Sequence, residues 1–66
     1  MLSARNQFKG TIKSVILGQV MAEVVIEVAG LEFVSLISRK SAERMNLKEG
    51  DEASAVIKAT AVMVDK

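Results

Sequence analysis

The sequence contains no cysteine, histidine, tryptophan, tyrosine or proline, and its only aromatic side chains are two phenylalanines. The absence of cysteine excludes disulfides and thiolate zinc sites. The absence of histidine removes the commonest metal ligand and the usual general base near neutral pH, so Ser-His and Cys-His nucleophiles are excluded as well. Glu23, Glu27 and Glu32 could pair across strands, but carboxylates on a strand usually form its solvated face. We therefore expect a binding protein and not an enzyme.

The sequence also lacks a large excess of either charge and any long apolar run. Nine basic and eight acidic residues give a net charge of +1, too weak a field for nonspecific adhesion to nucleic acid. The longest apolar run, residues 61–64, is far too short to span a membrane. Residues 1–6 lack the apolar core of a signal peptide. We expect a soluble cytoplasmic protein with no nucleic-acid or membrane partner.

The chain is short and apolar: 66 residues, of which half are hydrophobic. This length predicts a single domain over residues 1–66. A chain of this size buries only about 60% of the surface that its unfolded form exposes. Small domains compensate with disulfides, a structural metal or association. Because the first two routes are closed, we expect an oligomer of identical chains.

Apolar residues in the first half follow a period of two, which predicts strands over 7–16, 21–28 and 31–38. Glycine-marked turns at 17–19 and 29–30 would join them into an antiparallel meander. In the second strand, the residues sharing an apolar face are Ala22, Val24, Ile26 and Val28. In the first strand, one face carries Phe8, Gly10, Ile12 and Ser14, and the other carries Lys9, Thr11, Lys13 and Val15.

The pattern then changes to a short helix over 39–45. Ser38 is its expected N-cap, Ala42 and Met45 would face the sheet, and Asn46 would close it in the left-handed conformation, followed by Leu47 as a hydrophobic contact. Two further strands are predicted over 52–58 and 60–64. This order of elements predicts an all-β fold, a five-stranded OB-like Greek-key barrel with one short helix between strands 3 and 4.

OB-like barrels often bind nucleic acid by stacking bases on aromatic side chains above a basic groove. This chain offers only Phe8 and Phe33 and has no net positive field, so the composition argues against that role. A second alternative, a regulatory or subunit-interaction module that binds no small ligand, remains open.

Hydroxyls and cations are the chemical groups that stand out in this apolar chain. Ser38 and Ser41 bracket the first turn of the predicted helix, Lys58 lies in an apolar stretch, and residues 3–6 add a hydroxyl and a cation. Each has a plain structural interpretation: helix capping for the serines and an outward-facing strand position for Lys58. Together they form a donor set without a carboxylate, which suits a fully ionised oxyanion.

Six segments spread over nearly the entire chain are similar, in order and spacing, to motifs of the molbindin (Mop, TOBE-type) family. The first two resemble its S-A-R-N-x-(F/L)-x-G-x-(I/V) opening, the third its second-strand entry, and the fourth its A-I-T-x-x-S segment. The last two resemble its L-x-x-G-x and (V/L)-(I/L/V)-K-A-(T/S) segments. The six segments are residues 3–7, 8–12, 20–24, 36–41, 47–51 and 56–60.

This resemblance implies an OB-like barrel that binds molybdate or tungstate, and it does not decide whether molybdopterin binds. It implies the free intracellular form of the module, a homohexamer built as a trimer of dimers that stores or buffers the anion. The implied oxyanion site combines residues near the N-terminus and after the last matched strand with hydroxyls from the neighbouring subunit. Its residues are Ser3, Ala4, Arg5, Lys58 and Ala59, with Ser38 and Ser41 across the interface. A second site, formed mainly by backbone groups, is implied near Gln19, Val20 and Met21.

Elementary chemistry agrees with such a ligand. Molybdate is a dianion whose oxygens only accept hydrogen bonds, which matches hydroxyls, backbone amides and a lysine. Phosphate carries a proton at the same pH that needs an acceptor, and the matched residues include no carboxylate. Sulfate carries no such proton, so a site for molybdate must reject it by size, since molybdate is the larger tetrahedron. Tungstate and molybdate are too alike in shape and charge to be separated in this way.

Overall fold

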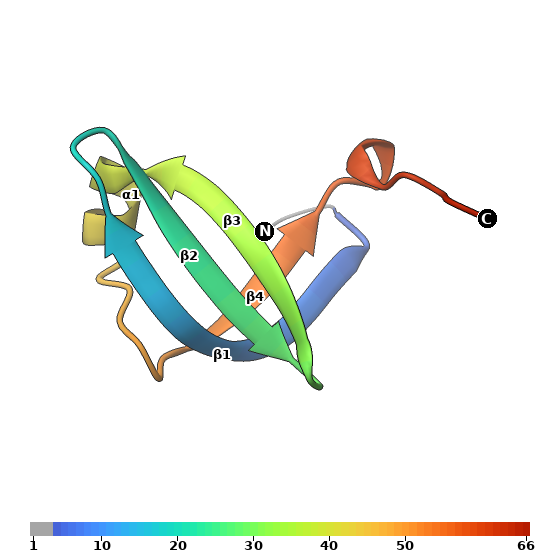
Figure 1. Cartoon of the computed structure of the whole chain (residues 1–66), viewed down its shortest axis with the longest axis horizontal. Coiled ribbons are helices and arrows are strands. Elements are labelled where there is room, and N and C mark those ends of the chain that lie inside the picture. Colours follow the sequence, from blue (N-terminus) through green and yellow to red (C-terminus); the bar gives the residue numbers. More distant parts are fainter. Residues whose placement is uncertain (1–3) are drawn as a thin grey trace.

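The computed structural model describes residues 4–66, so the predicted ligand Ser3 lies outside the described residues. Four strands form one antiparallel sheet with the order β3-β2-β1-β4, which curls into an incomplete barrel (Figure 1). The elements are β1 (Asn6–Leu17), β2 (Met21–Val28), β3 (Leu31–Ser38), α1 (Arg39–Arg44), β4 (Glu52–Ile57) and the single 3-10 turn η1 (Ala59–Ala61). The all-β, OB-like fold with one short helix is thus confirmed.

Strand β1 lies at the centre of the curled sheet and pairs with two neighbouring strands, β4 and β2. Its first half pairs with β4, from Asn6 opposite Ile57 to Thr11 opposite Glu52, and its second half pairs with β2. The strand passes very close to β2 at Gly10. A Cβ at this position would lie 2.6 Å from the Cγ2 atom of Val28 and closer still to the carbonyl oxygen of Glu27. Glycine is therefore required by the close approach of the two backbones.

A β-bulge interrupts the alternation predicted for β1. The register with β2 shifts between Ile12 and Ser14, so Lys13 is an extra residue and the faces exchange beyond it. The predicted faces are correct up to Ile12, which is only 1% exposed. They are wrong for Val15, which packs against the core on the same side as Ile12. A period of two cannot reveal an inserted residue, because the bulge depends on how β1 fits β2.

The core fills the concave side of the curled sheet. Ala22, Val24 and Ile26 of β2 are buried and Val28 is half-buried, as the alternation predicts. Ile12 from β1 and Ala55 from β4 complete the buried cluster. Half-buried apolar side chains surround it: Val15, Val28, Phe33, Ile37, Leu47 and Ala53. This small core agrees with the expectation that a chain of this length needs further burial elsewhere.

The helix α1 lies at one end of the barrel (Figure 1) and has the predicted caps. The Oγ atom of Ser38 accepts a hydrogen bond from the Ser41 amide. At the other end Asn46 is left-handed, with φ 52°, and the amides of Asn46 and Leu47 donate to the carbonyls of Glu43 and Ala42, a Schellman motif. Ala42 is buried as predicted.

Met45 lines a pocket together with Ile12 and Ile37 of the sheet, on the side that the prediction gave it, although the residue is 56% exposed. The helix ends one residue earlier, so Met45 is its C-cap and not part of the last helical turn.

The predicted fifth strand over 60–64 is wrong. Residues 59–61 form η1 instead, in which the Ala61 and Val62 amides donate to the carbonyls of Lys58 and Ala59. These local bonds replace a strand ladder. The tail then leaves the barrel as an extended segment without secondary structure (Figure 1), so the sheet has four strands and the barrel stays open between β3 and β4.

Apolar side chains remain on the outside of the molecule. The most exposed come from β1, the β1–β2 loop, β3 and the tail: Ile16, Val20, Leu31, Val34, Leu36, Met63 and Val64. Such exposure is typical of surfaces that meet another molecule. No helix among residues 4–66 has the length and hydropathy needed to cross a bilayer.

Candidate functional site

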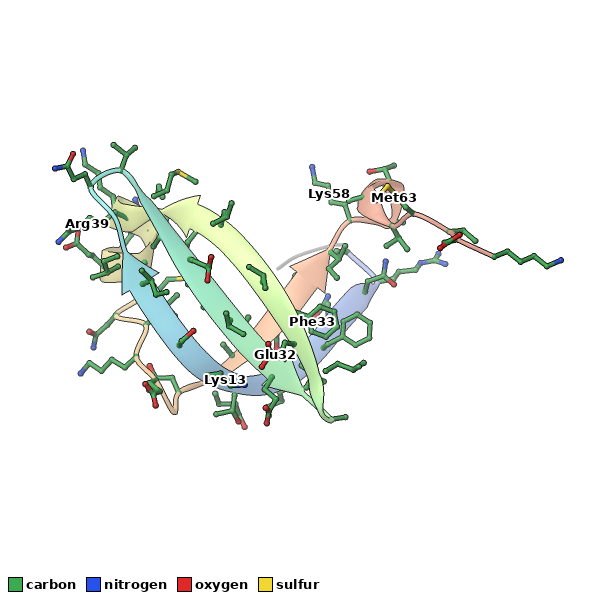
Figure 2. All side chains as sticks on the ribbon, viewed as in Figure 1. Lys13, Glu32, Phe33, Arg39, Lys58 and Met63 are labelled. Atoms are coloured by element: carbon green, nitrogen blue, oxygen red, sulfur yellow. The ribbon has the colours of Figure 1, made fainter. Side chains whose placement is uncertain are left out.

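The predicted anion-binding residues fall into two groups at opposite ends of the barrel. We call Ser38, Ser41 and the residues around them the helix-start group, and Ala4, Arg5, Lys58 and Ala59 the chain-end group. Figure 2 shows Arg39 beside the helix and Lys58 near the chain termini, with the length of the sheet between them. The two groups therefore do not form one site within a single copy of the chain.

The helix-start group is built where β3 ends. Ser38 is the last residue of β3, opposite Met21 at the start of β2, and its Oγ donates to the Ser41 Oγ over 2.8 Å. Because the same Ser38 oxygen accepts from the Ser41 amide at 3.1 Å, both hydroxyls are held together. The capping interpretation of these serines is thus correct, and these bonds also fix the positions of the two hydroxyls, of which that of Ser41 keeps its hydrogen free to donate.

One backbone and one side-chain hydrogen bond join this group to the loop between β1 and β2. The Arg39 amide donates to the Val20 carbonyl at 2.7 Å, and the Arg39 Nη1 donates to the Gly18 carbonyl at 3.1 Å. The Arg39 Nε also lies 3.4 Å from the Glu43 carboxylate. These bonds place the predicted second-site residues Gln19 and Val20 against the helix start.

A pocket of about 490 Å³ lies between the loop and the helix, and its lining joins residues from both predicted sites. It is lined by Gln19, Val20, Ser38, Arg39, Lys40 and Glu43. Two of the first helical amides, those of Arg39 and Ser41, are already bonded. An anion would therefore meet mainly hydroxyls and side-chain cations here, and fewer free helix amides than the sequence alone suggests.

Arg39 and Lys40 were not singled out as binding residues in the sequence analysis. Both line the pocket, and Arg39 is the only one of the two whose charge faces a carboxylate, that of Glu43. Two adjacent cations directly after a capping serine are a visible signal in the sequence. Their significance depends on the β1–β2 loop lying opposite them, which spacing does not reveal.

The chain-end group is assembled by the pairing of β1 with β4. Asn6 lies opposite Ile57, so the neighbouring residues Arg5 and Lys58 are brought to the same end of the sheet. Both side chains are exposed. The Gln7 side chain donates to the Ala4 carbonyl, and the Gln7 amide donates to the Arg5 carbonyl at 3.1 Å, which orders the chain before β1.

Lys58 follows the last residue of β4 and is the N-cap of η1. Ion pairs within residues 4–66 join Lys9 to Glu52, Lys13 to Glu32 and Arg39 to Glu43, and Lys58 takes part in none of them. The side chain is exposed, as its plain structural interpretation predicts, and its charge remains available to a ligand or to another subunit.

Two charged groups elsewhere, Lys13 and Glu32, are committed to each other. The Glu32 carboxylate accepts a hydrogen bond from Lys13 and raises the pKa of that lysine, first through the hydrogen bond and then through its charge. No cluster of three or more potential metal-binding side chains occurs in residues 4–66.

The two phenylalanines stack on each other. Phe8 of β1 and Phe33 of β3 have ring centroids 5.3 Å apart and nearly parallel planes. Since each ring covers a face of the other, the pair does not offer the open aromatic platform on which single-stranded nucleic acid stacks.

Residues 2–64 match the TOBE domain family. The chain belongs to this family. Its fold is that of solved relatives over the whole chain: it superposes with a TM-score of 0.94 on MopII from Clostridium pasteurianum, at 46% identity and full coverage of both chains. With a molybdate-binding protein from Sporomusa ovata the TM-score is 0.95 at 36% identity, covering 100% of this chain and 98% of the other.

Sequence relatives extend the comparison of this TOBE domain. It is 53% identical over 64 residues to molybdenum-pterin-binding protein 3 of Clostridium pasteurianum, covering 96% of this chain and 94% of the relative. It is also 43% identical, with a TM-score of 0.83, to the cytoplasmic molybdate-binding protein ModG solved with molybdate bound. That match covers 89% of this chain and 43% of ModG.

Proposed function

We propose that this TOBE domain binds molybdate or tungstate as the fully ionised oxyanion, for storage or homeostasis in the cytoplasm, and that it is not an enzyme. The observation that carries the proposal is the donor set: hydroxyls fixed at the helix start and the uncommitted cation Lys58. The names of relatives that align with nearly the whole chain support it. Binding of molybdopterin is not required by these donors.

The proposed oxyanion site lies between subunits of a homohexamer, arranged as a trimer of dimers. One subunit supplies the chain-end group together with Ser3, and its neighbour supplies Ser38 and Ser41. The separation of the two groups within one chain supports this arrangement (Figure 2). A dianion placed between them would meet cations from one copy and hydroxyls from the other. The two sets of donors together would bind the dianion more tightly than either set alone.

The loop residues Gln19, Val20 and Met21 form the proposed second site. Their position against the helix start adds Arg39 and Lys40 to the candidate ligands of an anion there. We expect this site to bind more weakly than the first, because Arg39 is partly neutralised by Glu43.

Calorimetric titration tests the proposed function. Molybdate added to the folded protein should release or absorb heat and raise the melting temperature, because a ligand that binds only the native state stabilises it by mass action. Sulfate at the same concentration should give a much smaller response, since it is the smaller tetrahedron. No heat and no stabilisation from either molybdate or tungstate would favour the alternative, a subunit-interaction module, which the exposed apolar side chains also fit.

Replacement of Ser38 separates its capping role from its binding role. Ser38→Ala should lower the free energy of unfolding by about 1 kcal/mol, because the Ser41 amide loses its cap, and it should also weaken molybdate binding. Ser38→Thr keeps the hydroxyl and should preserve both properties. Thermal melts and equilibrium dialysis on the two variants measure these effects. Unchanged affinity in a folded Ser38→Ala protein would remove this hydroxyl from the site.

A further inference from the structure

The pocket between the β1–β2 loop and α1 contains a carboxylate, which the residues proposed for the first anion site lack. Glu43 lines this pocket, and its side chain is 53% exposed. One carboxylate oxygen, Oε2, lies 3.4 Å from the Arg39 Nε. The other oxygen, Oε1, has no hydrogen-bond partner within residues 4–66. A ligand in the pocket would therefore meet a charged oxygen that can only accept a hydrogen bond.

Three side chains of the same pocket keep donors free. Arg39 uses its Nε and Nη1 atoms for Glu43 and the Gly18 carbonyl, which leaves its Nη2 atom. The side chains of Lys40 and Gln19 also line the pocket, and within residues 4–66 neither takes part in an ion pair or a side-chain hydrogen bond. The pocket thus combines donors, two of them cationic, with one negatively charged acceptor.

This combination of groups suits an oxyanion that still carries a proton. Hydrogen phosphate has oxygens that accept hydrogen bonds from the cations and one hydroxyl that can donate to Glu43. Molybdate, tungstate and sulfate have no hydrogen to donate near neutral pH, so one of their oxygens would lie against the Glu43 carboxylate. Two negative oxygens in contact repel each other, and a site built to bond a hydroxyl rejects an analogue that lacks it.

We propose that Glu43 makes the second anion site selective for an oxyanion that carries a proton, with inorganic phosphate as its ligand. This selectivity rests on the second site proposed above. The residues of the first site include no carboxylate and suit fully ionised molybdate, whereas the second site requires a donor for Glu43. The protein would thus sort two kinds of oxyanion by their protonation.

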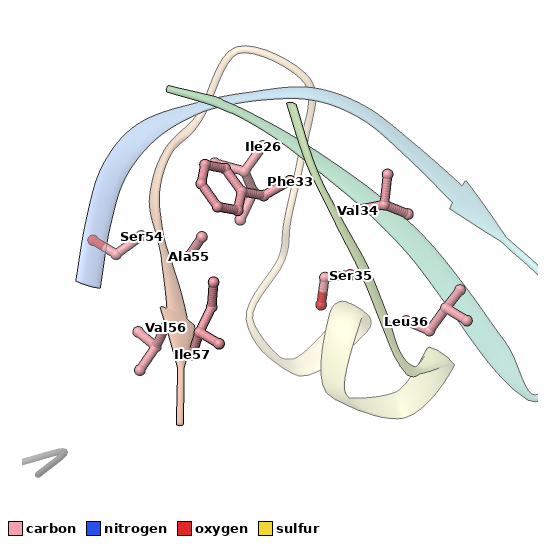
Figure 3. A pocket seen from close by; sticks show the side chains of 9 residues that line it. All are labelled: Ile26, Phe33, Val34, Ser35, Leu36, Ser54, Ala55, Val56 and Ile57. Carbon is pink, nitrogen blue, oxygen red and sulfur yellow. The ribbon is translucent and has the colours of Figure 1, made fainter. Parts of the chain in front are cut away.

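The open groove of the barrel is not an alternative place for phosphate. This groove of about 320 Å³ lies between β3 and β4, and Figure 3 labels the residues that line it. They are apolar except for Ser35 and Ser54, and none is charged. An anion there would lose its water without gaining a cation. The pocket beside the β1–β2 loop, with Arg39 and Lys40 in its lining, is therefore the better anion site.

Competition at about pH 8 tests the role of the proton. Radiolabelled phosphate is equilibrated with the full chain by dialysis, and sulfate, molybdate or methyl phosphate is added as competitor. Methyl phosphate is the closest match, because at about this pH it has the charge of hydrogen phosphate with a methyl group in place of the proton. Unlabelled phosphate should displace the label at concentrations about tenfold lower than any of the three. Equal displacement by methyl phosphate would assign the site to phosphate groups in general, as in monoesters, and would overturn the proposal, as would the absence of bound phosphate.

Glu43→Gln tests the acceptor itself. The amide oxygen can keep the hydrogen bond to Arg39, and the amide nitrogen then replaces the free acceptor with a donor. Phosphate should bind about tenfold more weakly, and sulfate and molybdate should become better competitors. Glu49→Gln makes the same change of charge in an exposed loop and should keep the preference for phosphate. An equal rise in affinity for every anion in Glu43→Gln would show that Glu43 acts through charge alone, contrary to the proposal.

Lysine variants locate the bound phosphate. Lys40→Ala should weaken phosphate binding about tenfold, because a charged donor is lost, while Lys48→Ala, in an exposed loop, should not. Loss of phosphate binding in Lys58→Ala but not in Lys40→Ala would place phosphate in the first site and overturn the selectivity proposed for Glu43. Molybdate binding by Lys58→Ala tests the first site separately, so either proposal can fail while the other stands.

Discussion

Gly10→Ala is expected to destabilise the protein severely, lowering the free energy of unfolding by about 3 kcal/mol. The added Cβ would overlap the Glu27 carbonyl oxygen and the Val28 side chain. The first of these is backbone in the neighbouring strand, so relief requires β1 and β2 to move apart. Since a domain of this size has only about 3–5 kcal/mol of stability from one core, this substitution should remove most of the free energy of unfolding.

Chemical denaturation followed by circular dichroism measures this effect. Thr11→Ala is the matched control, because it changes an exposed neighbour in the same strand and should alter the free energy of unfolding by well under 1 kcal/mol. A Gly10→Ala protein as stable as the control would show that β1 crosses β2 at a greater distance than the structure has.

Lys58→Ala is expected to weaken molybdate binding by about ten- to a hundredfold, because a charged donor to the dianion is removed. The side chain is exposed and pairs with no carboxylate within residues 4–66. Its loss should therefore leave the fold and the oligomer intact. Equilibrium dialysis gives the affinity, and sedimentation equilibrium gives the association state of the same preparation.

Lys48→Ala removes the same charge from an exposed loop position that belongs to neither group, and it should bind molybdate as the natural chain does. An equal loss in both variants would mean that net charge alone governs affinity. Unchanged affinity in Lys58→Ala would exclude this lysine from the site, while loss of the oligomer would assign it a structural role.

Local patterns allowed much of the fold to be predicted. The alternation in β2, the Ser38 cap and the left-handed Asn46 are each decided by a few neighbouring residues, because period-two burial and helix capping are short-range effects. The expectation of an incomplete core also follows from length and composition. The order of the motifs was sufficient to indicate the family to which residues 2–64 belong.

The candidate site was predicted less completely, because its geometry depends on contacts between distant segments. The sequence analysis proposed a donor set without Arg39 and Lys40, which face a loop about twenty residues earlier in the chain.

The sequence alone determined the absence of cysteine and histidine, the scarcity of aromatic residues and the types of donor that the proposed anion site uses. Only the tertiary structure decided the bulge at Lys13, the course of the tail and the separation of the two donor groups. The bulge and the separation follow from how strands distant in sequence fit together. The tail leaves the barrel because the local hydrogen bonds of η1 turn the backbone after β4 and replace a strand ladder.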